Sequence, residues 1–341
     1  MYFDWKLRYA FMDPKTESIF EKIAPQIPNH DLHITSRDNN ERYFIVKALN
    51  DRTYGTYYLY DAKTENLQKI VDTSPWLKEG QLAEMKPIAF KSRDGLTLHG
   101  YLTLPKGKTA KDLPIVVNPH GGPWARDFWR FSPTVQFLAN RGYGVLQVNF
   151  RGSTGYGKQF WESSFKKWGK EMQNDITDGV QWLIKAGVAD KDRICIFGGS
   201  YGGYATLAGL AFTPDLYKCG VDYVGVSNIF TLFKTIPPYW QPMREMLYTM
   251  VGDPVKDKAL LTEISPIFHA DKIKAALMVV QGAKDPRVNK AESDQMVEAL
   301  RKRGIEVPYI VKDNEGHGFH NEENRIEFYS AMEKFLAKHL D

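Results

Sequence analysis

The sequence predicts an α/β protein with a mostly parallel sheet, helices on both faces of that sheet, and a small antiparallel β segment at the N-terminus. From about residue 113 onward, short apolar runs such as "LPIVVNPH" (113–120) and "YGVLQVNF" (143–150) alternate with segments of helical periodicity. Strands that are apolar throughout are typical of parallel sheets covered by helices. Residues 41–72 differ, because their aromatic and β-branched runs are separated by tight turns, as in antiparallel strands.

The N-terminal segment is expected to span residues 1–85, ahead of a larger α/β domain of residues 86–341. Three strands are predicted from the runs "ERYFIVKAL", "GTYYLYDA" and "NLQKIVD", and a short helix is predicted near residues 16–23. A sheet of about thirty residues buries too little apolar surface to be stable by itself. We therefore expect this segment to pack on the larger domain or on a neighbouring chain.

The larger domain begins with a hairpin signal, since Asp94 and Gly95 stand between two alternating runs. Further strands are predicted at residues 113–120, 143–150, 193–197, 218–227, 275–282 and 307–313. Helices are predicted at residues 132–140, 173–187, 200–212, 290–304 and 322–340. In such sheets, functional residues gather at the carboxyl ends of the strands.

Composition excludes several classes of protein. A net charge of +4 over 341 residues, with no block of like charges, gives no support for nucleic-acid binding. Cys195 and Cys219 lie in apolar runs and lack disulfide or metal-ligand spacing, so buried reduced thiols are expected. Without an apolar leader or a run of about 18 apolar residues, we expect a cytoplasmic protein that does not contact membranes. No phosphate loop, metal-ligand cluster or dinucleotide fingerprint occurs, so no cofactor is expected.

The segment "RICIFGGSYGGYATL" (193–207) contains the pattern G-x-S-x-G around Ser200. A strand-like run precedes the pattern and a helix-compatible run follows it. In such a strand-to-helix turn, the serine is held in a strained conformation that lifts its hydroxyl clear of the sheet. The context therefore predicts that Ser200 is the nucleophile of an acyl-transfer hydrolase, and not one more small residue in a glycine-rich bend.

A serine nucleophile needs a base that takes its proton and an acid that orients the base. After this type of turn, the acid and the histidine follow in chain order, each in a loop after a strand. Asp285 follows "ALMVVQG" and His317 follows "VPYIVKD", as the pattern requires. Taken singly, Asp285 suits a turn and His317 suits a surface loop, but their joint placement favours a catalytic pair. His320 is the rival base, although its context, "HNEEN", is typical of a helix start.

A fourth element is "HGGPWARD" (120–127), which comes at the end of the strand-like run "LPIVVNPH" (113–120). A glycine pair at this position allows backbone N–H groups to point at an oxyanion that forms during acyl transfer. We predict an oxyanion hole made by the N–H groups of Gly122 and Tyr201; the alternative is a plain turn. His120 precedes the nucleophile in the chain, so we expect it to have a structural or orienting role.

Several consecutive segments resemble the prolyl oligopeptidase family of serine peptidases, and within it the acylaminoacyl-peptidase and dipeptidyl-peptidase-like branches. The resemblance runs from about residue 86 to the C-terminus, through "PHGGPWARD", "QVNFRGSTGYGKQF", "WGKEMQNDITDGVQWL", "GGSYGGYATL", "QGAKDPRV" and "EGHGF". It implies an α/β-hydrolase fold, a triad of Ser200, Asp285 and His317, and oxyanion donors at Gly122 and Tyr201. Where some branches have an oxyanion-assisting tyrosine, this sequence has a histidine, so a purely backbone hole is expected.

The resemblance also implies residues that bind substrate. Arg287 matches a position where some members use an arginine to bind a substrate carbonyl; the alternative is a surface arginine. The specificity pocket of relatives is apolar and is formed in part by Tyr201, Val226 and Val288. Trp124 and Trp240 are further candidates for its lining.

The sequence departs from the family at its N-terminal side. Family members carry a β-propeller that screens the active site, whereas only about 80 residues precede the hydrolase domain here. Their three predicted strands resemble a single remnant blade, and the unpaired edges of such a blade would suit a second copy of the chain in a homo-oligomer. Either the chain is a fragment of a longer protein, or it is a compact enzyme without this gate, in which an open site would admit small esters as well as short peptides.

Three functions are therefore compared. The first is a serine hydrolase that cleaves short peptides through an acyl-enzyme on Ser200. The second is a carboxylesterase that acts on small acyl or aryl esters with the same triad. The third is a catalytically inactive interaction module, against which the complete set of nucleophile, acid, base and oxyanion donors argues.

Overall fold

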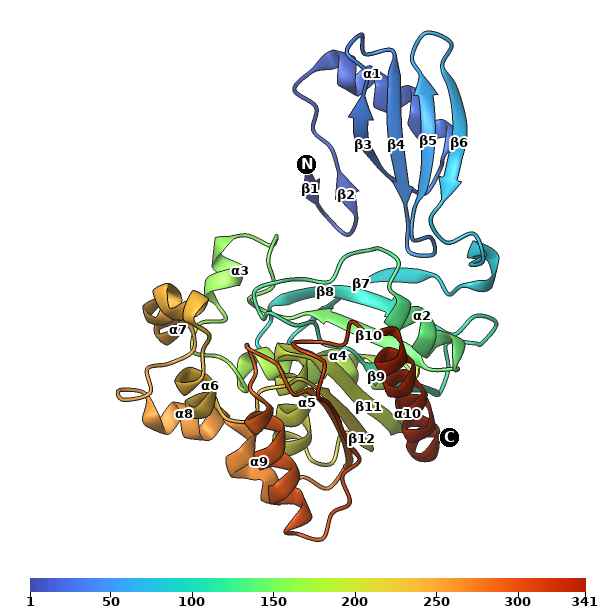
Figure 1. The fold of residues 1–341 in the computed structure, drawn as a ribbon. Helices are drawn as coiled ribbons and strands as arrows, with labels where there is room; N and C mark the ends of the chain where they lie inside the picture. The colour runs from blue at the N-terminus through green and yellow to red at the C-terminus, as the bar shows by residue number, and fades with distance from the viewer. The chain divides into compact units, whose positions relative to one another are not determined.

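The computed structural model describes residues 1–341, which form two compact units (Figure 1). The first unit comprises residues 1–87, 103–108 and 128–142. The second comprises residues 88–102, 109–127 and 143–341. Each unit is described separately below.

The first unit contains a four-stranded antiparallel sheet in the order β3-β4-β5-β6. Its elements are β1 (Tyr2–Phe3), β2 (Leu7–Arg8), α1 (Pro14–Ile23), η1 (Ala24–Gln26), β3 (Asp31–Arg37), β4 (Tyr43–Leu49), β5 (Thr56–Asp61), β6 (Asn66–Asp72), η2 (Glu79–Gln81) and α2 (Pro133–Asn140). The three strands predicted from residues 41–72 are β4, β5 and β6. The prediction was incomplete, because β3 precedes them. This strand lies at the edge of the sheet and buries only Leu32, so its sequence has little apolar alternation.

Helix α1 covers one face of this sheet. Asp13 caps the helix, since its carboxylate accepts hydrogen bonds from the N–H groups of Lys15 and Thr16. The apolar residues of the helix and the loop after it pack with buried residues of β3, β4 and β5, and together they form a core of Ile19, Ile23, Ile27, Leu32, Phe44, Val46, Ala48 and Tyr60. A helix was predicted here, and it supplies the apolar surface that the sheet alone lacks.

The second unit is built on an eight-stranded sheet in the order β14-β13-β12-β11-β9-β10-β8-β7. The strands are β7 (Met85–Lys91), β8 (Thr97–Thr103), β9 (Leu113–Val117), β10 (Gly144–Asn149), β11 (Ala189–Gly199), β12 (Cys219–Tyr223), β13 (Ala276–Gly282) and β14 (Tyr309–Lys312). The six strands from β9 onward pair in parallel. The predicted fold class is confirmed: a mostly parallel sheet with helices, plus a small antiparallel sheet near the N-terminus.

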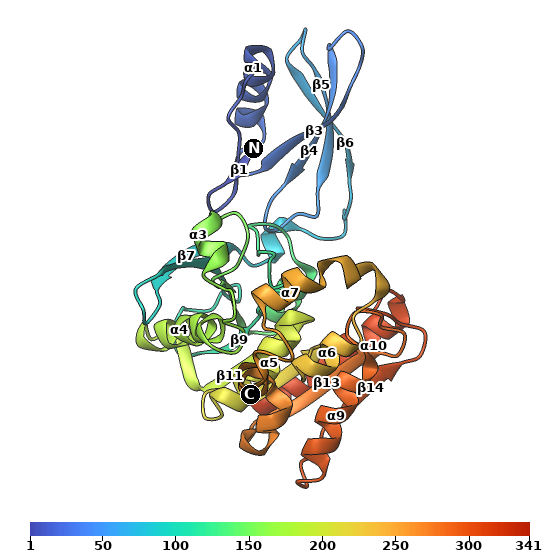
Figure 2. The same cartoon turned by 90° about the vertical axis from the view of Figure 1, so that its left-hand side faces the viewer.

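Helices lie on both faces of this sheet, with α5 and α10 on opposite sides of β11 and β12 (Figure 1). The helices are α3 (Lys158–Glu162), α4 (Glu171–Lys185), α5 (Tyr201–Phe212), α6 (Ile229–Lys234), α7 (Arg244–Met250), α8 (Lys258–Ile264), α9 (Lys290–Arg301) and α10 (Glu322–Leu340), with 3-10 helices η3 (Pro238–Met243) and η4 (Pro266–Lys272). Figure 2 shows α6, α7 and α9 as seen from the left-hand side of Figure 1. Every predicted helix is present, whereas the short helices α3 and α6–α8 were not predicted.

The largest shortening relative to prediction is in the strand expected at residues 218–227. The run at residues 218–227 forms a strand only up to Tyr223, because Val224 adopts a positive φ of 49° and turns the chain out of the sheet. The residues after this turn are therefore available to line a cavity at the carboxyl end of the sheet. No helix of the chain is both long and apolar enough to cross a bilayer.

Candidate active site

Ser200 occupies a turn of a single residue between β11 and α5. Its φ of 60° and ψ of −119° lie in a sparsely populated region for a residue with a side chain. The Ser200 N–H donates to the Tyr223 carbonyl oxygen at 2.9 Å, which ties the turn to the neighbouring strand. The strained turn predicted for this residue is thus present.

Two glycines make this turn possible because the backbone is crowded on both sides of it. A Cβ on Gly198 would lie 2.4 Å from the Gly202 carbonyl oxygen. A Cβ on Gly202 would lie 2.3 Å from the Pro119 carbonyl oxygen. Backbone atoms cannot move aside as the end of a flexible side chain can, so both positions require glycine.

Ser200, His317 and Asp285 form one hydrogen-bonded series. His317 Nε2 lies 2.9 Å from Ser200 Oγ, and His317 Nδ1 lies 2.7 Å from Asp285 Oδ2. Because a carboxylate only accepts, Nδ1 carries the proton and Nε2 is left to accept the serine proton. The three residues come from loops after β11, β13 and β14, separated by up to 117 positions in the chain.

The acid loop holds the Asp285 carboxylate through its other oxygen. Asp285 Oδ1 accepts hydrogen bonds from the N–H groups of Arg287 at 2.8 Å and Val288 at 3.0 Å. The carboxyl group is buried, so these bonds replace the water that it loses. One oxygen is therefore fixed by its own loop while the other faces the histidine.

Glu315 holds the histidine loop, a role that the sequence reasoning missed. Its buried carboxylate accepts four hydrogen bonds, from the backbone N–H groups of His320 and Asn321 and from the side-chain amides of Asn321 and Asn324. Burial alone would raise the pKa of Glu315, but these donors lower it to about 2 on balance. Its carbonyl oxygen also accepts from the N–H of Lys284, beside the acid. Glu315 thus links the loop that carries His317 to the loop that carries Asp285.

The predicted oxyanion donors lie beside Ser200. Gly122 and Tyr201 line the same cavity as Ser200, and a Cβ on Gly121 would lie 3.5 Å from Ser200 Cβ. The Tyr201 N–H belongs to the first turn of α5, where N–H groups have no acceptor within the helix. The helix dipole also favours negative charge at this end.

An apolar cavity of about 220 Å³ adjoins Ser200. It is lined by all five residues predicted for the pocket, Trp124, Tyr201, Val226, Trp240 and Val288. Its other side-chain lining includes residues that were not singled out, namely Trp168, Phe233, Ile236, Met243, Met246, Leu247 and Val251. The aromatic and methionine-rich segment "IPPYWQPMREMLYTM" (236–250) was the available signal for most of them. Arg287 has an exposed side chain and is not among the lining residues.

Comparison with known proteins now places the chain. A model of the prolyl oligopeptidase family matches residues 129–341. The chain belongs to this family. It is 44% identical over 346 residues to dipeptidyl aminopeptidase BIII of Pseudoxanthomonas mexicana. The matched region covers 99% of this chain and 50% of the relative. It is 39% identical over 338 residues to dipeptidyl peptidase family member 6 of Caenorhabditis elegans. The matched region covers 92% of this chain and 46% of that relative.

Solved structures of family members have the same fold. The acylaminoacyl peptidase of Pyrococcus horikoshii aligns with a TM-score of 0.79 at 27% identity, covering 92% of this chain and 50% of that one. A puromycin hydrolase aligns with a TM-score of 0.78 at 26% identity, covering 87% and 45%. The chain therefore spans about half the length of the relatives it matches.

Two other histidines near the site are held in different surroundings. The His120 ring stacks on Phe150 at 4.3 Å between centroids, and its Nε2 lies 2.9 Å from Ser153 Oγ. Loss of hydration lowers the pKa of His120 to about 4, so the ring is neutral at pH 7. His320 is exposed, and its backbone N–H donates to Glu315. Neither takes part in the hydrogen-bonded series at Ser200.

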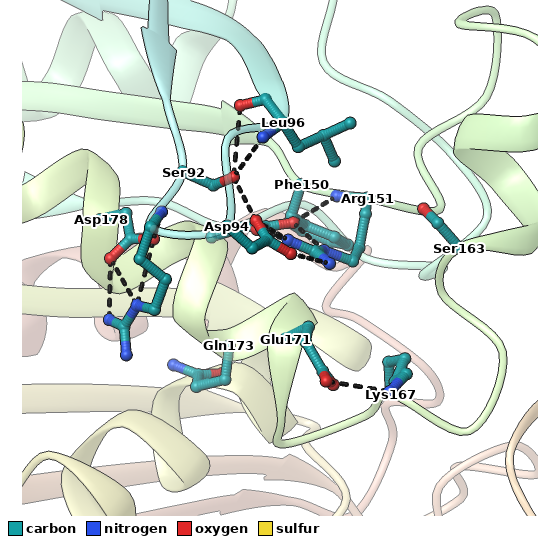
Figure 3. A network of polar contacts seen from close by, with 12 residues as sticks. Ser92, Asp94, Leu96, Phe150, Arg151, Ser163, Lys167, Glu171, Gln173 and Asp178 are labelled. Atoms are coloured by element: carbon teal, nitrogen blue, oxygen red, sulfur yellow. Dashed lines mark hydrogen bonds and ion pairs between the residues drawn. The ribbon is translucent and has the colours of Figure 1, made fainter.

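An ion-pair network centred on the buried Arg151 side chain lies beside Phe150 (Figure 3). Arg151 follows Phe150, whose ring packs against Tyr201 as well as His120. The Arg151 guanidinium makes two bonds to Asp175 of α4, at 2.7 and 2.8 Å, and two to Asp94 in the β7–β8 turn, at 2.8 and 2.9 Å. Burial raises the pKa of Asp175 to about 6, and the bonds from Arg151 act in the opposite direction. Arg151 thereby joins the turn of the predicted hairpin to α4.

Proposed function

We propose that this chain carries a serine-peptidase activity in which Ser200 attacks the acyl carbon of a peptide bond in a short peptide. The observation that carries the proposal is the hydrogen-bonded series from Ser200 Oγ through His317 to Asp285, with separations of 2.9 and 2.7 Å. Such a series makes a serine hydroxyl nucleophilic at neutral pH. We assign this chemistry to a catalytic domain of residues 86–341.

In the first half of the reaction, Ser200 Oγ bonds to the acyl carbon while His317 Nε2 takes the hydroxyl proton. Asp285 keeps the proton on Nδ1 and stabilises the imidazolium. The N–H groups of Gly122 and Tyr201 donate to the oxyanion. When the scissile bond breaks, His317 gives its proton to the leaving amine, and Ser200 is left as an ester.

In the second half, a water molecule gives a proton to His317 and attacks the Ser200 ester. The tetrahedral intermediate then collapses, the proton returns to Ser200 Oγ, and the acid product leaves. No cofactor is needed for this sequence, because each proton moves between the substrate, water and His317.

The cavity beside Ser200 suits an apolar side chain on the acyl side of the scissile bond. Val226, Val288 and Trp124 would contact that side chain, and apolar contacts of this kind stabilise it in proportion to the area buried. We further propose that Arg287 binds a carbonyl group of the substrate. The relative at 44% identity is named a dipeptidyl aminopeptidase, which supports peptides as substrates. A cytoplasmic location and a homo-oligomeric state stay predictions.

The experiment compares p-nitroanilides with p-nitrophenyl esters of the same acyl groups, using wild type and Ser200→Ala. The acyl groups are acetyl-alanyl, acetyl-phenylalanyl and alanyl-phenylalanyl with a free amino terminus. Anilide cleavage that falls at least about 10⁴-fold in Ser200→Ala supports the peptidase. Ester cleavage alone would instead support the carboxylesterase. A folded wild-type protein that cleaves neither would contradict both.

A further inference from the structure

The cavity beside Ser200 has walls of two kinds. Gly122, Tyr201 and Val288 follow the carboxyl ends of sheet strands and share the loops that carry the chemistry. The other wall is an irregular segment of short helices, which begins with α6 and continues through η3 and α7. Leu232 and Phe233 of α6 lie in this wall, and Val226 lies three residues before the start of α6. The width of the cavity depends on how far α6 lies from the loops that carry Gly122, Tyr201 and Val288.

A buried carboxylate that takes no part in the hydrogen-bonded series supports α6. Glu292 lies on α9, and only 1% of its surface is exposed. Its Oε2 accepts hydrogen bonds from the N–H of Asn228 at 2.8 Å and from the N–H of Ser227 at 3.0 Å. Its Oε1 accepts a hydrogen bond from the Thr231 hydroxyl. A buried carboxylate requires such donors, so the first turn of α6 is held firmly to α9.

Glu292 is connected at its other side to the acid loop. Its N–H donates to the carbonyl oxygen of Asn289, the residue that directly follows Val288. The side chain of Gln281, at the end of β13, donates to the Val288 carbonyl oxygen at 3.1 Å and accepts from Ser293 Oγ at 2.9 Å. The start of α9 is therefore fixed to the loop that carries Val288, and side chains of the same helix bind the start of α6.

The same group of side chains closes into one network. Gln295, one turn further along α9, donates to Ser227 Oγ at 2.9 Å and to Glu292 Oε2 at 3.1 Å. Ser227 Oγ in turn donates to the Glu292 carbonyl oxygen at 2.7 Å. A network in which the members satisfy one another specifies a single arrangement, whereas apolar contacts alone tolerate sliding.

We propose that Glu292 is a positioning residue that sets the width of the acyl-side pocket and thereby the preference for large over small apolar side chains. The inference rests on the proposed function of Ser200. Glu292 contacts the residues on each side of the pocket lining, Ser227 after Val226 and Thr231 before Leu232. A shift of α6 changes the fit of a large side chain, while a small one remains indifferent to it.

The test uses Glu292→Gln, which preserves size but presents an amide N–H₂ where donors already converge. Glu298→Gln is the matched control, since Glu298 lies on the same helix with an exposed side chain. For acetyl-phenylalanyl and acetyl-alanyl p-nitrophenyl esters, we expect kcat/KM to fall at least 10-fold for the former and less than 3-fold for the latter. The loss should lie mainly in KM. Glu298→Gln should leave both substrates unchanged.

An equal loss for both substrates, or no loss, would overturn the proposal, because a merely structural residue lowers the amount of active enzyme without changing the preference. If Glu292→Gln does not fold, Thr231→Val removes one hydroxyl donor and should shift the preference in the same direction by a smaller factor. An unchanged preference in that variant is equally negative. Ser200→Ala separates the two ideas: if it remains active, the proposed function fails, and if it is inactive while Glu292→Gln keeps the wild-type preference, only the role of Glu292 fails.

Discussion

The turn at Ser200 and the wall formed by residues 229–251 border the same cavity but are built in opposite ways. The turn has backbone atoms packed so closely that a methyl group cannot be added at Gly198 or Gly202. The wall consists of short helical segments, and its Met243 and Met246 side chains are 38% and 44% exposed. The turn is therefore determined by local backbone geometry, and the wall by side chains that reach it from elsewhere.

This difference indicates how each region tolerates change. A reacting atom must be placed within a fraction of an ångström, which regular strand ends and a crowded turn achieve. A pocket wall needs only the right shape and apolar surface, and methionine is well suited to fit irregular shapes. We therefore expect steep losses for changes at the turn and graded losses for changes at the wall.

The largest effect is expected from Gly198→Ala. The added methyl group would meet three backbone atoms of Gly202, the closest at 2.4 Å, and the turn would have to shift. We expect kcat/KM to fall at least about 1000-fold, which is the order of effect of a lost catalytic contact. Gly80→Ala is the control, because nothing lies within 4 Å of its added Cβ. Ester hydrolysis by a folded Gly198→Ala protein within 10-fold of wild type would refute the crowding argument.

Asp222→Asn tests the packing beneath the turn through pH. The Asp222 carboxyl is buried between Gly203 and Gly225, and burial raises its pKa to about 7, from 3.8. The Asp222 carboxyl ionises near pH 4 in the unfolded chain and near pH 7 in the folded chain. The stability of the wild type therefore falls as pH rises through this interval. Asn cannot ionise, and the stability of the variant relative to wild type should rise by up to about 4 kcal/mol between pH 4 and pH 8.

Urea unfolding at several pH values measures this difference. Asp215→Asn is the control, because the Asp215 side chain is 82% exposed. A difference between Asp222→Asn and wild type that does not change with pH would mean that Asp222 ionises normally in the folded protein.

Glu315→Gln should have an intermediate effect, on the histidine loop. Four N–H donors would face an amide in place of a carboxylate, so we expect a loss of about 1–3 kcal/mol in the free energy of unfolding at pH 7. Because the lowered pKa of Glu315 favours folding only while the group is charged, the difference from wild type should shrink as pH falls from about 4.5 toward 2.

In the same variant, kcat should fall while KM changes little, since Glu315 holds the loop of His317 and does not line the cavity. Glu323→Gln, an exposed change in the first turn of α10, should alter neither quantity. A normal kcat in Glu315→Gln would show that the histidine loop keeps its position without this carboxylate.

The smallest effect is expected from Met246→Ala at the pocket wall. Removing a partly exposed side chain should lower kcat/KM for acetyl-phenylalanyl ester about 3- to 10-fold and leave acetyl-alanyl ester unchanged. Met12→Ala, at a fully exposed methionine, controls for the substitution itself. If Met246→Ala proved as damaging as Gly198→Ala, the contrast between turn and wall would not hold.

Much of the sheet could be predicted because its strands carry their signal locally. In the runs "RICIF" and "ALMVVQG", four and five successive residues are apolar, as expected of strands buried on both faces. β3 was missed because it is an edge strand with one buried residue. Helices α6, α7 and α8 were missed because six or seven residues complete two turns at most, too few for a periodicity to emerge.

The sequence by itself determined the order of Ser200, Asp285 and His317 and the strand ends that carry them, because the strand-to-helix turn imposes its own pattern of glycines. Tertiary structure alone decided which side chains support them. Glu292 meets Ser227 across 65 positions and Arg151 meets Asp94 across 57, and no local pattern marks either pair. The physical reason is that a backbone turn restricts its own residues, whereas a buried charge restricts whichever distant donors the fold brings within reach.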